Sequence, residues 1–428
     1  MCETVDSDGF GLTRRRFVAG ASGLAASGLA VGLAGERAFA DPRPPAKVPL
    51  GSQPAGLPKR QHAWGDYVAK DAYGNALAPK YDRLLFFDVK GTPTPAHARL
   101  LESRLRTLER HFHWRHTGLL FTVSWGPSYF KLLGVKSPIP RARKLSTFEH
   151  PEIDNYDMCL HLASDDEKRL EQIEAALAHG RKLPGVASSL SLKTALAWRE
   201  TRTGFAGTGI PATHQGVKGI PSTHPVSSDA PLFMGFQSGL RKNQNTEDGV
   251  TIEHGRFAGG TTMHVSYMRE PLDSWYEKLS QEDRIALMFS PETNATRQQK
   301  IIEGHTDASA NTKELVAAIK NYGRVGHSQA TAQARKHGRP LIIRRDFNTI
   351  DGDYAGLHFV SVQKSIDDFV ITRNAMNASN AHHINKQVTH TKNNGINAFI
   401  KVRRRANYIM PSRADRSFPL LPGRAAAL

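Results

Sequence analysis

The sequence contains little cysteine and no long hydrophobic run. Of its 428 residues only Cys2 and Cys159 are cysteines, and Cys2 lies in an N-terminal segment with the features of an export signal. Once that segment is removed, Cys159 is alone, which excludes an intramolecular disulfide. A Cys-x-x-Cys-His motif is also missing, which excludes covalently attached c-type haem.

Acidic residues are scarce relative to basic ones. The chain has 57 Lys and Arg against 40 Asp and Glu, which gives a formal net charge of +17. Residues 1–40 hold four basic and four acidic residues, so the excess belongs to the mature protein. Such a surface stays soluble and attracts anions, but it does not by itself indicate a nucleic-acid partner.

The N-terminus has the pattern of a twin-arginine export signal. Thr13-Arg14-Arg15 precedes Phe17 and a Gly/Ala-rich apolar stretch, and Ala38-Phe39-Ala40 fits a cleavage site. We therefore predict a signal at residues 1–40, the twin-arginine export machinery as a partner, and a location in the periplasm, the cell envelope or outside the cell. Because the apolar stretch is short, we expect a membrane anchor only if the signal stays uncleaved.

Residues 41–230 predict an extended arm followed by a first α+β half. Pro, Gly and Lys dominate residues 41–80, which favours an extended arm. In residues 81–230, apolar runs predict strands, and apolar residues at helical spacing predict helices. The expected order is strand 81–91, helix 95–114, strands 118–126 and 156–166, and helix 165–180. Residues 200–230 are rich in Gly, Thr, Pro and Ser and predict a long connection.

Residues 231–428 repeat this scheme. The expected order is strand 257–270, helix 271–289, strands 340–347 and 355–364, and helix 365–378. Two such halves predict the α+β class and a duplicated ferredoxin-like fold, with two antiparallel sheets and flanking helices. The basic segment 401–416 predicts a solvated C-terminal tail or an anion contact, and in an exported protein we expect no nucleic acid there.

Four segments of the second half follow one another in an informative order. They are MGFQSGL (234–240), GGTTMHVSYMREPLDSW (259–275), GHSQATAQARKHGRPLIIRRDF (326–347) and GLHFVSVQKSIDDFVITRNAM (356–376). Each motif alone is weak, but their shared order resembles the dye-decolourising (DyP-type) haem peroxidase family. LLFTVSWGPSYFKLLG (119–134) in the first half is similar to the same family, so the resemblance covers residues 81–378.

The resemblance implies an enzyme that holds one haem b and oxidises an unidentified electron donor with hydrogen peroxide. His327 matches the axial ligand of the haem iron, and Arg344 matches the distal arginine. Arg345 is the near alternative, because a one-residue slip would exchange the faces of the two arginines. Three residues match the loop over the distal haem face, namely Gly235, Phe236 and Gly239. Leu357 and Phe359 share a strand face and would line the pocket, with plain core packing as an equal alternative.

Ser238 stands where the resembled family has its distal aspartate. A peroxidase must move a proton from the near to the far oxygen of peroxide; a carboxylate can do this, whereas a serine hydroxyl needs an activating partner. Ser238 can still hydrogen-bond a bound water or peroxide. General acid–base help is worth about 10²–10⁴-fold in rate. Asp346 is a substitute base, although strand alternation should point it away from one of the two arginines.

This departure leaves three functions open. The leading hypothesis is an exported haem peroxidase, and the second is a haem- or porphyrin-binding protein with little or no turnover. The third is an exported basic protein that binds an anionic cell-surface polymer without a cofactor.

His382, His383 and His390 could bind a metal, but no carboxylate or cysteine completes a ligand set, so we favour an exposed face. Homo-oligomer formation stays open.

Overall fold

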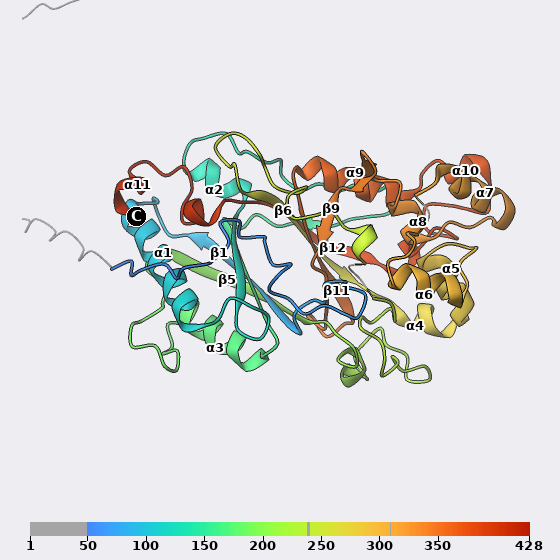
Figure 1. Cartoon of the computed structure of the whole chain (residues 1–428), viewed down its shortest axis with the longest axis horizontal. Coiled ribbons are helices and arrows are strands. Elements are labelled where there is room, and N and C mark those ends of the chain that lie inside the picture. Colours follow the sequence, from blue (N-terminus) through green and yellow to red (C-terminus); the bar gives the residue numbers. More distant parts are fainter. Residues whose placement is uncertain (1–48, 238–239, 309) are drawn as a thin grey trace, which may run out of the picture. The chain divides into compact units, whose positions relative to one another are not determined.

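The computed structural model describes residues 49–237, 240–308 and 310–428. The chain forms two compact units, Met1–Ala46 and Lys47–Leu428, and every described residue belongs to the second. The predicted signal at residues 1–40 therefore lies outside the described residues, as do Ser238 and Gly239. The second unit is an α+β fold built around one large sheet (Figure 1).

The first half of the second unit is a ferredoxin-like motif. Its main elements, in β-α-β-β-α-β order, are β1 (Tyr81–Val89), α1 (Pro95–His111), β2 (Leu120–Trp125), β4 (Met158–Ser164), α3 (Glu167–Leu177) and β5 (Leu196–Phe205). The strands lie in the order β5-β1-β4-β2, and all neighbours are antiparallel. The inserted elements are α2 (Pro127–Leu132) and β3 (Glu152–Ile153).

The second half repeats the motif with a long insertion between its first two strands. Its sheet has the order β12-β6-β11-β9, from β12 (Lys401–Met410), β6 (Thr261–Arg269), β11 (Gly356–Gln363) and β9 (Ile342–Arg344). Helix α9 (Ile366–Asn377) precedes β12. The insertion holds α4 (Leu272–Glu277), α5 (Gln281–Met288), α6 (Ala295–Ile302), α7 (Thr312–Tyr322), α8 (His327–Thr331) and the hairpin β7 (Arg335–Lys336) and β8 (Arg339–Pro340). The remaining elements are β10 (Phe347–Thr349), α10 (Ala381–Ile384) and α11 (Arg424–Ala427).

The two ferredoxin-like sheets are joined at both edges. On one side β2 pairs with β12 through Trp125 and Ile409. On the other side β10 pairs with β5 through Asn348 and Phe205, and it also pairs with β11. The predicted duplicated ferredoxin-like fold is confirmed, and its two antiparallel sheets are continuous with each other in one ten-stranded sheet.

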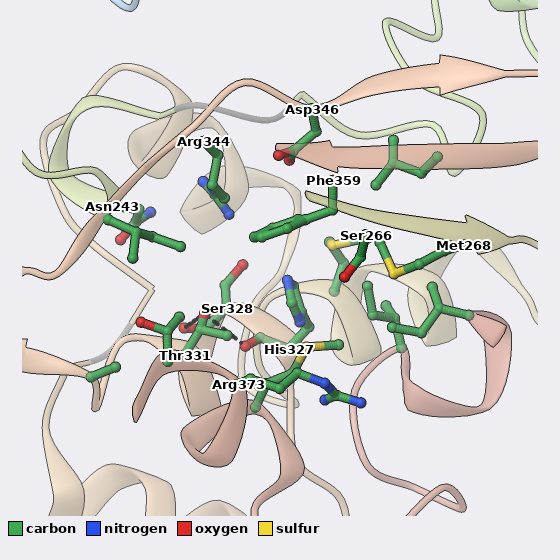
Figure 2. Close-up of a pocket in the computed structure, with 18 of the residues that line it drawn as sticks. Asn243, Ser266, Met268, His327, Ser328, Thr331, Arg344, Asp346, Phe359 and Arg373 are labelled. Carbon is green, nitrogen blue, oxygen red and sulfur yellow. Dashed lines mark hydrogen bonds between the residues drawn. The ribbon is translucent and has the colours of Figure 1, made fainter. Parts of the chain in front are cut away.

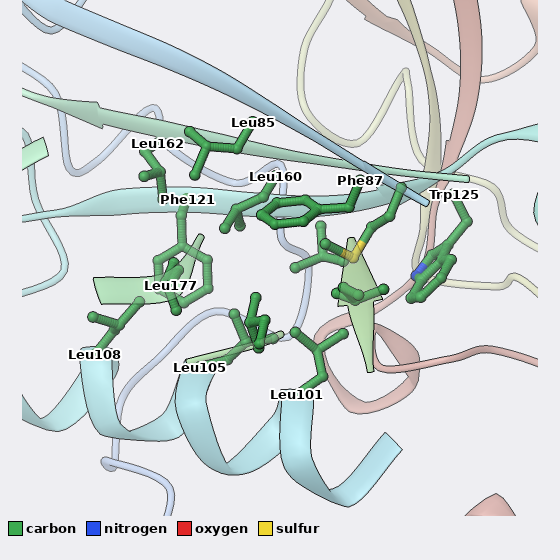
Figure 3. Close-up of a cluster of buried hydrophobic side chains, with 14 of the residues drawn as sticks. Leu85, Phe87, Leu101, Leu105, Leu108, Phe121, Trp125, Leu160, Leu162 and Leu177 are labelled. Carbon is green, nitrogen blue, oxygen red and sulfur yellow. The ribbon is translucent and has the colours of Figure 1, made fainter. Parts of the chain in front are cut away.

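The first sheet is covered on both faces, which explains its continuous apolar runs. In β1, Leu84 and Phe86 face a core shared with the second sheet, whereas Leu85 and Phe87 face α1 and α3. Figure 3 shows leucines of α1 packed against Phe87 and the neighbouring strands. Helix α1 begins at Pro95 because the Thr94 side chain accepts a hydrogen bond from the His97 N–H.

The second sheet is polar on the face that points away from the shared core. Its inner face contributes Met263, Val265, Val360 and Val362 to that core. The alternate residues point outward and are largely polar, with His264, Ser266, Asn407 and Arg405 among them. Helices α8 and α9 lie over this face, and the space between them and the sheet is not filled by side chains. This is where the functional site lies.

Three sequence predictions need correction. Residues 401–416 are not a solvated tail. Residues 401–410 form β12, between β2 and β6. Arg405 of this strand, and Arg413 and Arg416 after it, are buried in ion pairs with glutamates. The predicted connection at 200–230 begins inside β5, whose charged residues include Arg202, paired at 2.7 Å with Asp154. The predicted helix 271–289 is two helices, because Ser280 caps a new start at α5. No helix among the described residues is long and apolar enough to span a membrane.

Candidate functional site

A large cavity lies on the outer face of the second sheet, bounded by β6, β11, β12, α8 and α9. Its empty volume is about 1450 Å³, including the open space at its mouth. Much of the wall is apolar, with Met268, Met288, Phe359, Met376, Ile396 and Val402 among its residues.

His327 projects into this cavity from the start of α8 (Figure 2). Two glycines fix its backbone. A Cβ at Gly326 would lie 2.1 Å from the Phe289 carbonyl oxygen, and a Cβ at Gly395 would lie 3.0 Å from the His327 Cα. Gly395 also has a φ of +53°, which favours glycine. Both neighbouring segments can therefore approach closely and hold the imidazole in place.

The imidazole of His327 is neutral at physiological pH. Burial, together with the positive charges of Arg344 and Arg373, lowers the pKa of His327 to about 3. Its Nδ1 atom is buried and has no hydrogen-bond partner among the described residues. A neutral imidazole has a free lone pair on one ring nitrogen, which is the form that binds metals.

Arg344 faces His327 from the opposite wall (Figure 2). It ends β9, where its backbone N–H donates to the Gln244 Oε1 at 2.5 Å. The Nε atom of Arg344 is buried without a hydrogen-bond partner among the described residues. Asp346, two residues further on, lines the same cavity, and Figure 2 shows the Phe359 ring projecting between this wall and His327.

Arg345 does not line the cavity, so the prediction that it binds a cofactor is not supported. Its guanidinium lies over the Trp64 ring, 4.0 Å from the centroid, and donates to the His62 carbonyl oxygen. The cause is the alternation of side chains in an extended segment, which sends neighbouring residues to opposite faces. The register therefore selects Arg344 of the two arginines.

Two buried arginines add positive charge to one wall. Arg373 of α9 and Arg405 of β12 both line the cavity and share a single carboxylate, that of Glu149. The Arg373 Nη2 to Glu149 Oε1 distance is 2.6 Å, and the Arg405 Nη1 to Glu149 Oε2 distance is 3.0 Å. One carboxylate cannot neutralise two guanidinium groups, so this wall favours an anionic ligand group.

Glu270 is a carboxyl group that the sequence analysis did not identify. It directly follows β6, is 2% exposed and lines the cavity. Burial, together with the negative charge of Asp346, raises the pKa of Glu270 to about 8. The side chain is therefore protonated at neutral pH. Its position on the same face as Ser266 and Met268 was predictable from the alternation of side chains along a strand. Its burial was not predictable from the sequence.

The other predicted site residues divide between two adjoining cavities. Leu357 and Phe359 line the large cavity, as does Phe236. Gly235 lines a smaller cavity of about 560 Å³, which shares Phe236, Gln237, Leu240 and Phe289 with the large one. Ser238 and Gly239 lie outside the described residues, so their roles stay predictions. No group of three or more His, Cys, Asp or Glu that could hold a metal ion occurs among the described residues, the His382–His390 region included.

The sequence matches the profile of a family of unknown function, DUF7405, over residues 79–412. The chain belongs to the DUF7405 family. A comparison with curated proteins gives no match. For this DUF7405 member, function has to be argued from the fold and the cavity.

Solved structures similar to this DUF7405 protein are DyP-type peroxidases. A DyP-type peroxidase from Cellulomonas bogoriensis is 20% identical with a TM-score of 0.52, covering 78% of this chain and 90% of that chain. A DypB variant from Rhodococcus jostii in complex with heme is 12% identical with a TM-score of 0.53, covering 84% and 98%. The oxyferrous complex of DtpA from Streptomyces lividans is 18% identical with a TM-score of 0.53, covering 78% and 89%. The predicted resemblance to DyP-type peroxidases is confirmed, and at these identities it establishes the fold.

Proposed function

We propose that this protein is a haem-dependent peroxidase of the dye-decolourising type, which uses hydrogen peroxide to oxidise an electron donor. One observation carries the proposal: His327 and Arg344 face each other across one cavity whose wall is largely apolar. An arrangement of a neutral imidazole opposite a fixed guanidinium suits a metal on one side and a developing negative charge on the other.

The residues present fit a haem group. His327 would hold the iron through its neutral ring, and the apolar wall would surround the porphyrin. Arg373 and Arg405 would lie near the anionic propionates, because Glu149 leaves their combined charge positive. A bound haem supplies the redox chemistry. Haem-ligating histidines usually donate their second ring N–H to an acceptor, and His327 Nδ1 lacks one among the described residues, which leaves that nitrogen for a water.

The side chains on the Arg344 wall act on the peroxide itself. The guanidinium of Arg344 is fixed at the end of β9 and stabilises negative charge that develops on the departing oxygen. The twin-arginine route, a location outside the cytoplasm and the identity of the donor remain part of the proposal.

An absorption spectrum after haem loading tests the cofactor. We expect the purified protein to show a Soret band, and the variant His327→Ala to lose it or to show it strongly shifted. The exposed His383 provides a matched control, because His383→Ala removes an imidazole that faces solvent. An unchanged band in His327→Ala would remove His327 as the ligand, and a colourless wild type would refute the proposal.

A second function is favoured by the sequence at position 238. Ser238 cannot act as a base without an activating partner, so the protein could bind haem or another porphyrin with little turnover. Stopped-flow mixing of the haem-loaded protein with hydrogen peroxide separates the two functions. A rapid spectral change supports the peroxidase, whereas an unchanged spectrum supports the binding protein. A faster reaction in Ser238→Asp would indicate that position 238 faces the reacting peroxide.

A further inference from the structure

Glu270 is held in the cavity by the strand ladder, and its carboxyl group lacks a partner. Its backbone N–H donates to the Ala355 carbonyl at 2.9 Å, which extends the pairing of β6 with β11. Alternation along β6 places Ser266, Met268 and Glu270 on one face, and all three line the cavity. The Oε2 atom of Glu270 is buried without a hydrogen-bond partner among the described residues. A buried polar atom of this kind costs free energy, so a retained one calls for a functional explanation.

Charged and titratable groups face Glu270 from three segments. Asp346 lies on the Arg344 wall, and its charge acts on Glu270. Tyr276 of α4 lies near enough to Glu270 for ionised Glu270 to raise the Tyr276 pKa, and the Tyr276 hydroxyl donates to the Phe233 carbonyl. Phe233 lies in the segment that leads directly to Ser238 along the chain. The other charged groups of the cavity are Arg335, Arg344, Arg373 and Arg405.

The Glu270 carboxyl lies near a second carboxyl group, that of Asp346. Burial and the Asp346 charge keep the Glu270 carboxyl neutral at pH 7, because its pKa is raised to about 8. Asp346 carries the negative charge that contributes to this effect. Two nearby carboxyl groups of opposite protonation state are the usual arrangement of an acid and a base in one site.

We propose that Glu270 is the proton donor of this cavity and that Asp346 is the accompanying base, in place of the carboxylate that position 238 lacks. The inference rests on the proposed peroxidase function. A carboxylate oxygen of Asp346 takes the proton from the near oxygen of hydrogen peroxide. Glu270 Oε2 gives its proton to the far oxygen, which leaves as water when the O–O bond breaks. The proton on Asp346 then returns to Glu270. A haem held by His327 would supply the two electrons that cleavage of the O–O bond consumes.

The first experiment needs neither haem nor turnover. Infrared spectra of the haem-free protein should contain a carbonyl band of a protonated carboxylic acid at pH 7, which disappears as the pH rises through about 8. Glu270→Gln should lack this band. Glu277→Gln should retain it, because Glu277 is an exposed residue at the end of α4. Asp346→Asn removes the negative charge beside Glu270, so the band should disappear at a lower pH than in the wild type. An unchanged pH dependence would mean that the two groups do not interact, and it would overturn the pairing.

The second experiment measures the reaction with peroxide in the haem-loaded protein. We expect Glu270→Gln to retain the Soret band of the wild type and to react about 10²–10⁴-fold more slowly with hydrogen peroxide, the usual range for lost acid–base catalysis. Glu277→Gln should react as the wild type does. If Glu270→Gln reacts at the wild-type rate, Glu270 is not the donor, although the proposed peroxidase function stands. If the wild type does not react at all, the proposed function fails and the inference fails with it.

Discussion

Replacing Glu270 with Gln should stabilise the protein, and by an amount that grows with pH. Gln has nearly the same shape but cannot ionise. The wild-type folded state holds a proton on Glu270 up to about pH 8, whereas the unfolded chain releases it near pH 4.5. Between these values the folded state binds one more proton than the unfolded state, so the free energy of unfolding falls as pH rises. The slope is about 1.4 kcal/mol per pH unit.

The magnitude follows from the pKa difference. Because Glu270 is 2% exposed, solvent screening is small, and the full difference corresponds to an upper value of about 5 kcal/mol above pH 8. Partial relaxation of the site would reduce this, and we expect about 2–4 kcal/mol. At pH 5 the wild type and Glu270→Gln should differ by less than about 1 kcal/mol.

Urea unfolding of the haem-free proteins at several pH values measures this difference. The wild type, Glu270→Gln and the exposed control Glu277→Gln are compared between pH 5 and pH 9, with m-values checked for constancy. The stability gap of Glu270→Gln over the wild type should widen across this range, whereas that of Glu277→Gln should stay flat. A gap that does not change with pH would mean that Glu270 ionises normally in the folded protein, and the reasoning about its burial would be wrong.

Three further perturbations have defined outcomes. Glu149→Gln leaves Arg373 and Arg405 buried without their shared carboxylate, so we expect a loss of about 3–5 kcal/mol in urea unfolding. Gly326→Ala forces a Cβ to within 2.1 Å of the Phe289 carbonyl oxygen, so it should destabilise the protein by about 1–3 kcal/mol and weaken haem binding measured by titration. In the haem-loaded wild type, the rate of reaction with peroxide should fall as pH rises above about 8, because Glu270 donates only in its protonated form, and Glu270→Gln should lose this dependence.

The fold was predictable because most of its strands are covered on both faces. The apolar runs of β1, β2 and β4 are visible in the sequence, and their order with α1 and α3 indicates a ferredoxin-like half. Strand β5 could not be recognised in the sequence, because it has no apolar run. Its charged residues form ion pairs with β12 and with the segment before β4. The same cause hid β12. An arginine-rich strand appears solvated unless its glutamate partners, distant in sequence, are known.

The site was partly predictable from the order of its motifs. His327 and Arg344 were identified from sequence, and the structure brings them to one cavity. Alternation decides between Arg344 and Arg345, which the sequence left open. Glu270 could not be found in this way. Its significance depends on burial and on the nearby charge of Asp346, and both arise only when β6 and the segment after β9 come together in space.

The duplicated fold itself explains why the cavity lies in the second half. Both halves place helices over the outer face of a four-stranded sheet, but the first half fills the interface with Leu85, Phe87 and Leu160. In the second half, Ser266 of β6 and Glu270, which directly follows β6, point outward. Both are polar, so they cannot complete a hydrophobic core. The long insertion between β6 and β9 then carries His327 over this face. The first copy of the motif therefore has a filled hydrophobic core. The second copy has a cavity in the same place, lined by an imidazole, a guanidinium and two carboxyl groups.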